Sequence, residues 1–267
     1  MYPHALECFG VSLDIWNVTF LVAVLAGYPV LIRAIHLRRP GPLPRWLPTR
    51  WLIIVYLSAL AAQLFAYLFD LHTSLLPPSD VSWARYYLDP LFGSKTLYGV
   101  IVFLPLSILA VSLPWRDLGY TEALDCWTPP LFAVLGLCRI GCFLQGCCYG
   151  RVSPTFGISF PPYGALYYRQ LDQHLISPDS PTLPVLPTQL IEAGVLFALC
   201  AWSLALLRRG RTGIFPLGVL AYSLLRFVIE LLRDDPDRNF LGPLSSSQWI
   251  AVTLLASYPL WKRRAFN

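Results

Sequence analysis

Apolar residues dominate this sequence in long runs, which are separated by short polar, basic and proline-rich stretches. A helix of about 20 apolar residues crosses a hydrocarbon core of about 30 Å, and several of the runs have that length. The pattern therefore predicts an all-α polytopic membrane protein with about seven transmembrane helices. The predicted spans cover residues 11–32, 51–71, 96–113, 127–145, 187–207, 213–232 and 246–261.

The composition agrees with a membrane protein. The chain has 267 residues, of which 56% are hydrophobic and only 13% are charged, and its mean hydropathy is +0.56. These values fit neither a soluble globular domain nor a disordered chain. We expect a single transmembrane domain over residues 1–267. The first residues contain no basic segment and no small-residue cleavage site, so we expect the first span to be retained.

The basic residues predict the orientation in the membrane. Connections on one side of the predicted spans hold about twice as many Lys and Arg as those on the other side, and basic loops face the cytoplasm. This places the N-terminus outside and the C-terminus in the cytoplasm. The net charge of +5 then reflects topology, so no nucleic-acid partner is expected. The outer loops 72–95 and 146–186 are rich in aromatic residues, which suit either an interfacial belt or a small outer cap.

A charged residue inside a membrane span costs about 2.5–3.5 kcal/mol at the helix centre, so each one needs a reason. Arg139, Glu192, Arg226 and Glu230 lie on three different spans, yet counting residues brings them to a similar depth below the outer surface. Arg226 and Glu230 have the i,i+4 spacing of a pair that neutralises itself. Arg139 has no such neighbour and needs Glu192 or an anionic ligand. Two arginines at headgroup depth predict a site for a phosphate-bearing lipid that faces the outer leaflet.

Four of the seven cysteines lie between Cys138 and Cys148. The sequence has no Cys-x-x-Cys pair and no finger-like spacing, so it offers little support for a zinc or thioredoxin-like site, and we expect neither a metal nor a cofactor. Two interpretations stay open. Cys142 could form a disulfide with Cys147 or Cys148, or the thiols could pack as small apolar groups.

The segment Arg139-Ile-Gly-Cys-Phe-Leu-Gln-Gly-Cys-Cys-Tyr-Gly150 resembles the signature of the prolipoprotein diacylglyceryl transferases, Arg-Ile-Gly-Asn-Phe-Ile-Asn-Gly-Glu-x-x-Gly. Further matches occur in the same order along the chain. They are Leu124-Asp125 followed by Pro129, Pro187-Thr-Gln-Leu-Ile-Glu192, Arg226-Phe-Val-Ile-Glu230 followed by Arg233, and Gly242-Pro-Leu-Ser245 with Gln248. The resemblance covers roughly residue 124 to the C-terminus and extends to the family's seven spans.

The resemblance implies an enzyme of the bacterial cytoplasmic membrane. Such an enzyme moves the diacylglyceryl group of phosphatidylglycerol to the thiol of the lipobox cysteine in an exported prolipoprotein, and glycerol phosphate leaves. On this basis Arg139, Arg226 and Glu230 are the expected catalytic residues, and the arginines bind the phosphate and its developing charge. The expected substrate-binding residues are Glu192, Tyr98, Cys142, Cys147 and Gly150.

The sequence departs from the family pattern at several positions. Tyr98 stands where the family has a His that is a candidate base, and tyrosine, with a pKa near 10, is a poorer base at neutral pH. Cys142 and Cys147 replace an Asn and a Glu, and Phe9 replaces a Tyr. Two alternatives therefore stay beside the transferase hypothesis: a divergent paralogue with another acceptor, and a non-catalytic lipid-binding membrane protein.

Overall fold

The computed structural model describes residues 6–8, 11–13, 15–69, 97–112, 119–162, 164–234 and 240–265. The predicted outer loop 72–95 lies outside the described residues. All seven predicted spans occur as helices, and a short extra helix, α6, lies in the second predicted outer loop. The helices are α1 (Ile15–Arg38), α2 (Leu47–Phe69), α4 (Leu97–Ser112), α5 (Tyr120–Gln145), α6 (Ala165–Asp172), α7 (Thr188–Arg208), α8 (Ile214–Leu232) and α9 (Ser246–Ala265).

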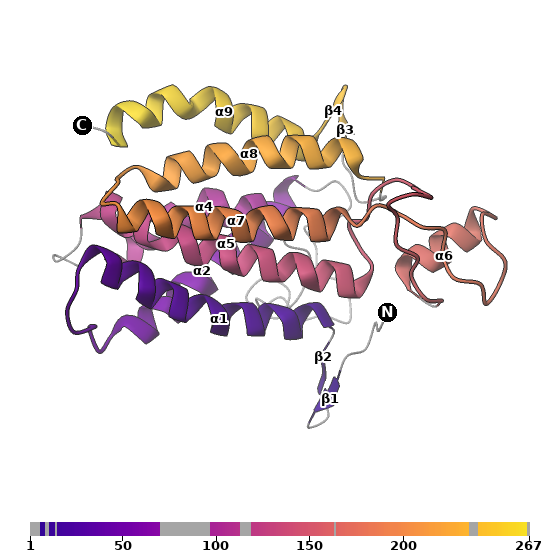
Figure 1. Ribbon diagram of the computed structural model, residues 1–267, viewed down its shortest axis with the longest axis horizontal. Coiled ribbons are helices and arrows are strands. Elements are labelled where there is room, and N and C mark those ends of the chain that lie inside the picture. The colour runs from indigo at the N-terminus through magenta and orange to yellow at the C-terminus, as the bar shows by residue number, and fades with distance from the viewer. Residues whose placement is uncertain are drawn as a thin grey trace.

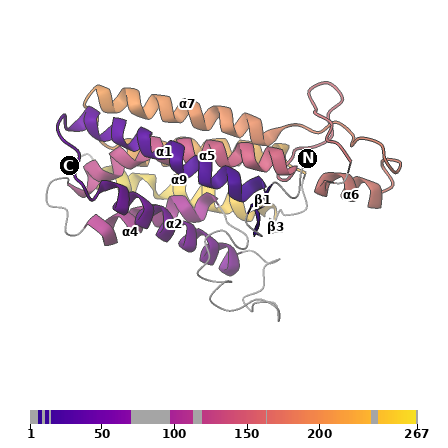
Figure 2. The same cartoon turned by 90° about the horizontal axis from the view of Figure 1, so that it is seen from below.

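The long helices lie side by side along a common axis, and α6 projects beyond one end of the bundle, which we call the capped end (Figure 1). The first residues of α1 are at the capped end, whereas the last residues of α9 are at the opposite end (Figures 1 and 2). Two small antiparallel hairpins complete the described secondary structure. They pair β1 (Leu6–Cys8) with β2 (Val11–Leu13) and β3 (Phe240–Leu241) with β4 (Leu244–Ser245).

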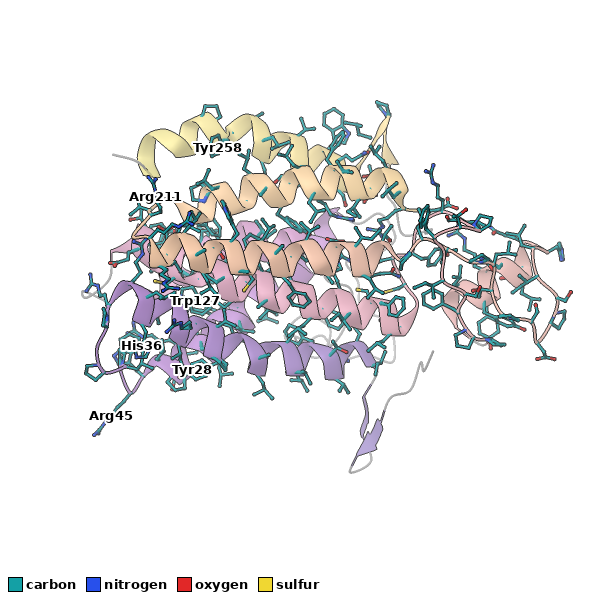
Figure 3. The ribbon with its side chains drawn as sticks, viewed as in Figure 1. Tyr28, His36, Arg45, Trp127, Arg211 and Tyr258 are labelled. Carbon is teal, nitrogen blue, oxygen red and sulfur yellow. The ribbon has the colours of Figure 1, made fainter. Side chains whose placement is uncertain are left out.

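Helix α5 is the centre of the bundle. It packs most extensively against α1 and α7 and also contacts α4 and α8. Along its length it contributes buried apolar side chains such as Trp127, Phe132 and Leu135 to the core. The Trp127 ring stacks on Trp51 with 5.1 Å between the ring centroids. Figure 3 shows Trp127 in the half of the bundle away from α6.

The outward faces of the bundle are apolar, as expected of helices that contact lipid. Leu25 on α1, Leu52 on α2 and Leu231 on α8 are among the exposed large side chains. Among the described residues, five helices are long and apolar enough to cross a membrane: α1, α2, α5, α7 and α8. The protein is therefore a polytopic membrane protein. Helix α4 is shorter, with 16 residues.

Helix α5 begins at Tyr120, earlier than the predicted start at residue 127. The first turns of α5 contain polar residues, which is why the predicted span started later. These residues have partners at the end of the bundle opposite the cap. Glu122 Oε2 pairs with Arg39 Nη2 at 3.0 Å. Asp125 accepts hydrogen bonds from the first backbone N–H groups of α8, at Gly213, Ile214 and Phe215. A carboxylate of α5 thus satisfies donors that helix α8 leaves unpaired at its N-terminus.

Candidate functional site

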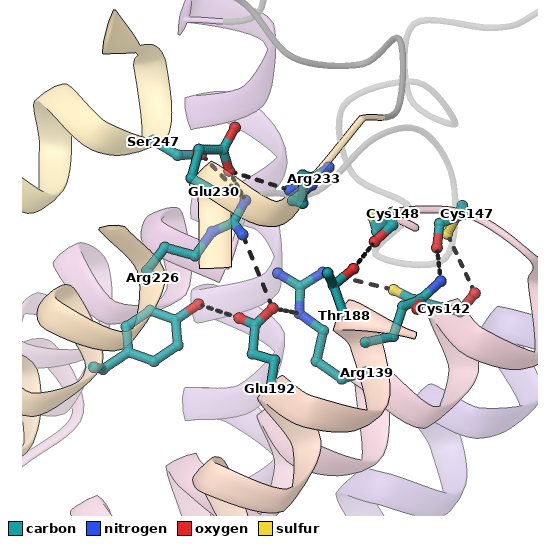
Figure 4. Close-up of polar contacts among 12 residues, drawn as sticks. Arg139, Cys142, Cys147, Cys148, Thr188, Glu192, Arg226, Glu230, Arg233 and Ser247 are labelled. Carbon is teal, nitrogen blue, oxygen red and sulfur yellow. Dashed lines mark hydrogen bonds and ion pairs between the residues drawn. The ribbon is translucent and has the colours of Figure 1, made fainter. Parts of the chain in front are cut away.

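The four charged residues predicted to lie at one depth meet at the capped end of the bundle. Arg139 comes from the last turns of α5, Glu192 from the first turns of α7, and Arg226 and Glu230 from the last turns of α8 (Figure 4). All four are buried, with exposed fractions between 1% and 6%. Charges taken out of water in this way need close partners of opposite sign.

These residues form an alternating ladder of arginines and glutamates. Arg139 Nε lies 2.9 Å from Glu192 Oε2, and the same oxygen lies 3.9 Å from Arg226 Nη1. Arg226 Nη2 lies 2.8 Å from Glu230 Oε2, which is the predicted i,i+4 pair. Arg233 Nη1 ends the ladder at 3.6 Å from Glu230 Oε2. The self-neutralising pair therefore exists, but it is one step of a larger network, and of the two partners expected for Arg139 the structure shows Glu192.

Three further side chains complete the network and were not predicted as site residues. The Tyr222 hydroxyl donates to Glu192 Oε1 at 3.1 Å, and Arg226 Nη2 donates to Ser247 Oγ at 3.3 Å. The third is Arg233, which belongs to the motif that begins at Arg226 but was given no role in the sequence analysis. Tyr222 precedes Arg226 by one helical turn, so the i,i+4 spacing was a usable signal for it.

The arginines retain capacity for a ligand. Arg226 Nη1 is buried and makes no hydrogen bond within the part of the chain that the structure describes; its distance to Glu192 is that of an ion pair only. The Arg139 Nη1 group makes a long contact of 3.9 Å with the Cys142 sulfur. Buried donors of this kind suit a phosphate, whose oxygens accept several N–H groups in fixed directions.

The chain reverses direction directly beyond Arg139. Gly146 ends α5 in the left-handed conformation, with φ of 77°, and its N–H donates to the carbonyl oxygens of Cys142 and Phe143. Cys148 also has a positive φ, 60°, which costs a residue other than glycine on the order of 1 kcal/mol. The turn brings the sulfur atoms of Cys142, Cys147 and Cys148 within 4.8 Å of one another. These three thiols are the described residues that could hold a metal, and their linear spacing did not reveal it.

The two thiols beyond the end of α5 differ in acidity. Hydrogen bonds with Cys142, which have the larger effect, and with Cys147 lower the pKa of Cys148 well below its usual value. Hydrogen bonds with Cys142 and Cys148 raise the pKa of Cys147 well above its usual value. All six cysteines whose side chains the structure describes are free thiols.

Gly150 lies where three segments meet at the capped end. Its N–H donates to the Leu186 carbonyl at 2.9 Å, and it forms an isolated bridge with Arg233. A Cβ at this position would lie 2.7 Å from the Leu232 carbonyl oxygen and 2.8 Å from Thr188 Cγ2. Gly150, predicted as a substrate-binding residue, therefore joins the start of α7 to the end of α8 by close backbone approach.

Tyr98 lies in the first turn of α4, and its side chain lies outside the described residues. Within residues 146–186, the second predicted outer loop, the structure shows a small cap with its own core of Tyr149, Phe160, Leu166 and Val185. Arg169 of α6 donates to the Tyr149 hydroxyl at 2.8 Å and to the Asp234 carbonyl at 2.7 Å, which fastens the cap to the end of α8.

An apolar cavity of about 80 Å³ lies between α1, α2, α4 and α5. Its walls include Trp16 and Phe20 of α1, Ala62 of α2 and Leu104 of α4. Cys138, the neighbour of Arg139 in the chain, also lines it. Through Cys138 the cavity reaches the residue that precedes Arg139 in the chain.

Fold and site together define a class: a polytopic membrane protein that holds a buried arginine–glutamate site near one end of its bundle, next to an apolar cavity. A family model described as prolipoprotein diacylglyceryl transferase matches residues 3–260. The chain belongs to this family.

Individual relatives carry the same description. The phosphatidylglycerol–prolipoprotein diacylglyceryl transferase 2 of Clostridium perfringens is 34% identical over 175 residues, which is 61% of this chain and 60% of the relative. The corresponding protein of Clostridium tetani is 29% identical over 62% of this chain and 61% of its own length. That of Dehalococcoides mccartyi is 28% identical over 79% of this chain and 78% of its own length. The chain thus spans about three fifths of the length of the first two relatives.

Proposed function

We propose that this protein transfers the diacylglyceryl group of phosphatidylglycerol to the lipobox cysteine of an exported prolipoprotein. Membership of the family supports this proposal, as do the names of the relatives in Clostridium and Dehalococcoides. The observation that carries it is the position of Glu192 Oε2 between the guanidinium groups of Arg139 and Arg226. This arrangement holds two forked donors on neighbouring helices, facing one small volume.

In the proposed reaction the arginines act on the phosphate. Arg139 and Arg226 bind the phosphodiester of the donor lipid, and their interaction strengthens as negative charge develops on the leaving glycerol phosphate. Glu192 and Glu230 compensate the buried charge of the guanidinium groups and fix their orientation, and Tyr222 positions Glu192 through its hydroxyl. The network is thus preorganised, which avoids a reorganisation cost during the reaction.

The apolar cavity beside the ladder suits an acyl chain. Most of its lining consists of aromatic and aliphatic side chains, which suit a hydrocarbon, and the lining includes Cys138, the residue before Arg139 in the chain. We infer that it receives part of the diacylglyceryl group while the headgroup lies at the ladder.

The proposed orientation follows from the same site. The capped end faces the outer leaflet of the bacterial cytoplasmic membrane, where an exported prolipoprotein presents its cysteine. The start of α1 then lies outside and the end of α9 in the cytoplasm. The basic residues at and beside the α1–α2 connection, Arg38, Arg39, Arg45 and Arg50, support this orientation.

Complementation tests the proposal in cells. A bacterial strain depleted of its own diacylglyceryl transferase should grow again when this chain is expressed, and its lipoproteins should carry the diacylglyceryl modification. The Arg139→Ala, Arg226→Ala double variant, expressed to the same level, should not restore growth. Failure of the wild-type chain to rescue, at full expression in the membrane, would contradict the proposal and favour a divergent acceptor or a lipid-binding role.

A further inference from the structure

The thiols of Cys142, Cys147 and Cys148 form a cluster that the proposed phosphate chemistry does not use. Their sulfur atoms lie within 4.8 Å of one another, with Cys142 buried and the other two half-buried. A zinc ion binds thiolates at about 2.3 Å in tetrahedral geometry, which sets its sulfur ligands about 3.8 Å apart. The cluster matches this spacing after a contraction of about 1 Å at most.

The backbone around the cluster is held from α7. Gln189 Nε2 donates to the Cys147 carbonyl oxygen at 2.5 Å, and Thr188 Oγ1 donates to the Cys148 carbonyl oxygen at 2.8 Å. Cys148, which accepts one of these hydrogen bonds, has a left-handed backbone conformation with φ of 60°. Both polar side chains bind carbonyl groups, so they fix the positions from which the thiols converge. Such fixed surroundings are typical of metal ligands in proteins.

The charge of the surroundings also suits a metal–thiolate group. A zinc ion with three thiolates carries one net negative charge, since each thiolate contributes one and the ion contributes two of opposite sign. Arg139 Nη1 lies 3.9 Å from the Cys142 sulfur and faces this group. A guanidinium that contacts both a ligand sulfur and the phosphate site places the metal beside the reacting lipid.

We propose that Cys142, Cys147 and Cys148 bind one zinc ion, and that its fourth coordination position receives the thiol of the acceptor cysteine. The second part rests on the proposed transferase function. Zinc sites that act in catalysis have three protein ligands and one open position, and a thiol that coordinates zinc is deprotonated outright. The site would therefore generate the thiolate nucleophile in a chain that has Tyr98 where the family has a histidine.

The reaction then balances without an oxidant or reductant. The acceptor S–H proton leaves to water when the sulfur binds zinc. The zinc-bound thiolate attacks the glyceryl carbon that is esterified to phosphate, so a C–S bond forms. The C–O bond to phosphate breaks, its electron pair stays on the phosphate oxygen, and glycerol phosphate leaves from Arg139 and Arg226. The thioether product is a weak ligand and dissociates from zinc.

Metal binding is tested first, without turnover. The full chain is purified in detergent, reduced, freed of metal with a chelator, and titrated with Zn²⁺, and separately with Cd²⁺ to follow the thiolate-to-cadmium absorption. We expect one ion per chain. Each single variant, Cys142→Ser, Cys147→Ser or Cys148→Ser, should lower the affinity for Zn²⁺ by at least about 100-fold, because each removes a direct ligand. Cys200→Ser, which removes a buried thiol of α7 outside the cluster, is the matched control and should bind as the wild type does.

The open position is tested with a peptide. X-ray absorption at the zinc edge should show three sulfur ligands in the protein alone and four after addition of a lipobox peptide, in the absence of phosphatidylglycerol. With the same peptide carrying Ser in place of its cysteine, the number of sulfur ligands should stay at three. Zinc affinity should fall as the pH is lowered, because protons compete for the thiolates.

Several results would overturn this inference. They are the absence of stoichiometric binding by the reduced protein, unchanged affinity in the Cys142→Ser, Cys147→Ser double variant, and a sulfur count that the cysteine peptide does not raise. Because none of these measurements needs turnover, they are separate from failure of the transferase function. That failure would appear as absent glycerol phosphate release from a chain that binds zinc normally.

Discussion

The two ends of the bundle handle buried charge differently. At the end opposite the cap, Asp125 Oδ1 accepts from the N–H groups of Ile214 and Phe215, and Oδ2 accepts from Gly213 and lies 3.4 Å from Arg38 Nη2. Four partners fill the acceptor capacity of a carboxylate. At the capped end, Glu192 Oε2 is shared by two arginines, and Arg226 Nη1 is left without a hydrogen bond among the described residues. A cluster whose hydrogen-bonding capacity is filled by the protein holds helices together, whereas a cluster with an unused donor can bind a ligand.

Loss of the saturated cluster should have the largest effect on stability. Asp125→Ala removes the cap of α8 and leaves Arg38 without its carboxylate in a mostly buried position, so we expect a loss of about 3–5 kcal/mol in unfolding free energy. Thermal unfolding in detergent measures it. Glu122→Ala is the control, since its pair with Arg39 is more exposed and should contribute less than about 1 kcal/mol. Equal losses in the two variants would contradict the assignment of Asp125 as the structural centre.

Arg226→Lys should show the opposite behaviour at the capped end. Lysine keeps the charge but loses the planar fork that binds two oxygens, so turnover should fall by about 100-fold while the protein remains folded. Release of glycerol phosphate from phosphatidylglycerol liposomes, beside the melting temperature, separates the two effects. If the variant loses stability but retains its rate per folded molecule, Arg226 has a structural role like that of Asp125.

Gly150→Ala tests the junction between α7 and α8. The added Cβ would approach the Leu232 carbonyl oxygen to 2.7 Å, so we expect a loss of about 1–3 kcal/mol from overpacking, with a matching loss of folded, active protein. Gly194→Ala, in α7, is the matched control because no heavy atom lies within 4 Å of the added Cβ. It should leave stability unchanged or raise it by about 0.5–1 kcal/mol. A neutral Gly150→Ala would show that the segments are not in close contact.

Tyr222→Phe should have an effect similar in size to that of Gly150→Ala. It removes one hydrogen bond to the buried Glu192 carboxylate. A hydrogen bond to a charged group contributes about 1.5–3 kcal/mol. Because Tyr222 acts through Glu192, the maximal rate should fall more than the apparent affinity for phosphatidylglycerol. A change confined to affinity would argue that Tyr222 contacts the lipid directly.

The contrast between the two ends also explains what the sequence predicted. Apolar runs of the right length predicted the helices, and counting residues along them brought Arg139, Glu192, Arg226 and Glu230 to one depth, because helical rise is uniform. The role of Asp125 depends on which helix begins beside α5, and local patterns do not contain that information. The start of α5 was misplaced for the same reason, because its polar first turns find partners only after folding.

The sequence predicted that Cys142 could reach Cys147 or Cys148, but it did not predict that all three thiols converge. Cys142 is the last-turn residue of a helix, and the left-handed conformations of Gly146 and Cys148 return the chain to it. The spacing Cys-x-x-x-x-Cys-Cys is not one that predicts a metal site by itself. Tyr222 was missed because a tyrosine in an apolar helix is usually read as a packing residue, and only its position one turn before Arg226 distinguishes it.

The most direct test of the central claim is glycerol phosphate release by purified protein, given phosphatidylglycerol in liposomes and a lipobox peptide. The wild-type chain and the Gly194→Ala control should release one molecule of glycerol phosphate for each peptide molecule that is modified. The Arg139→Ala, Arg226→Ala double variant should fall to background. Full release by the double variant, or none by the folded wild type, would contradict the assignment of the capped-end ladder as the site of diacylglyceryl transfer.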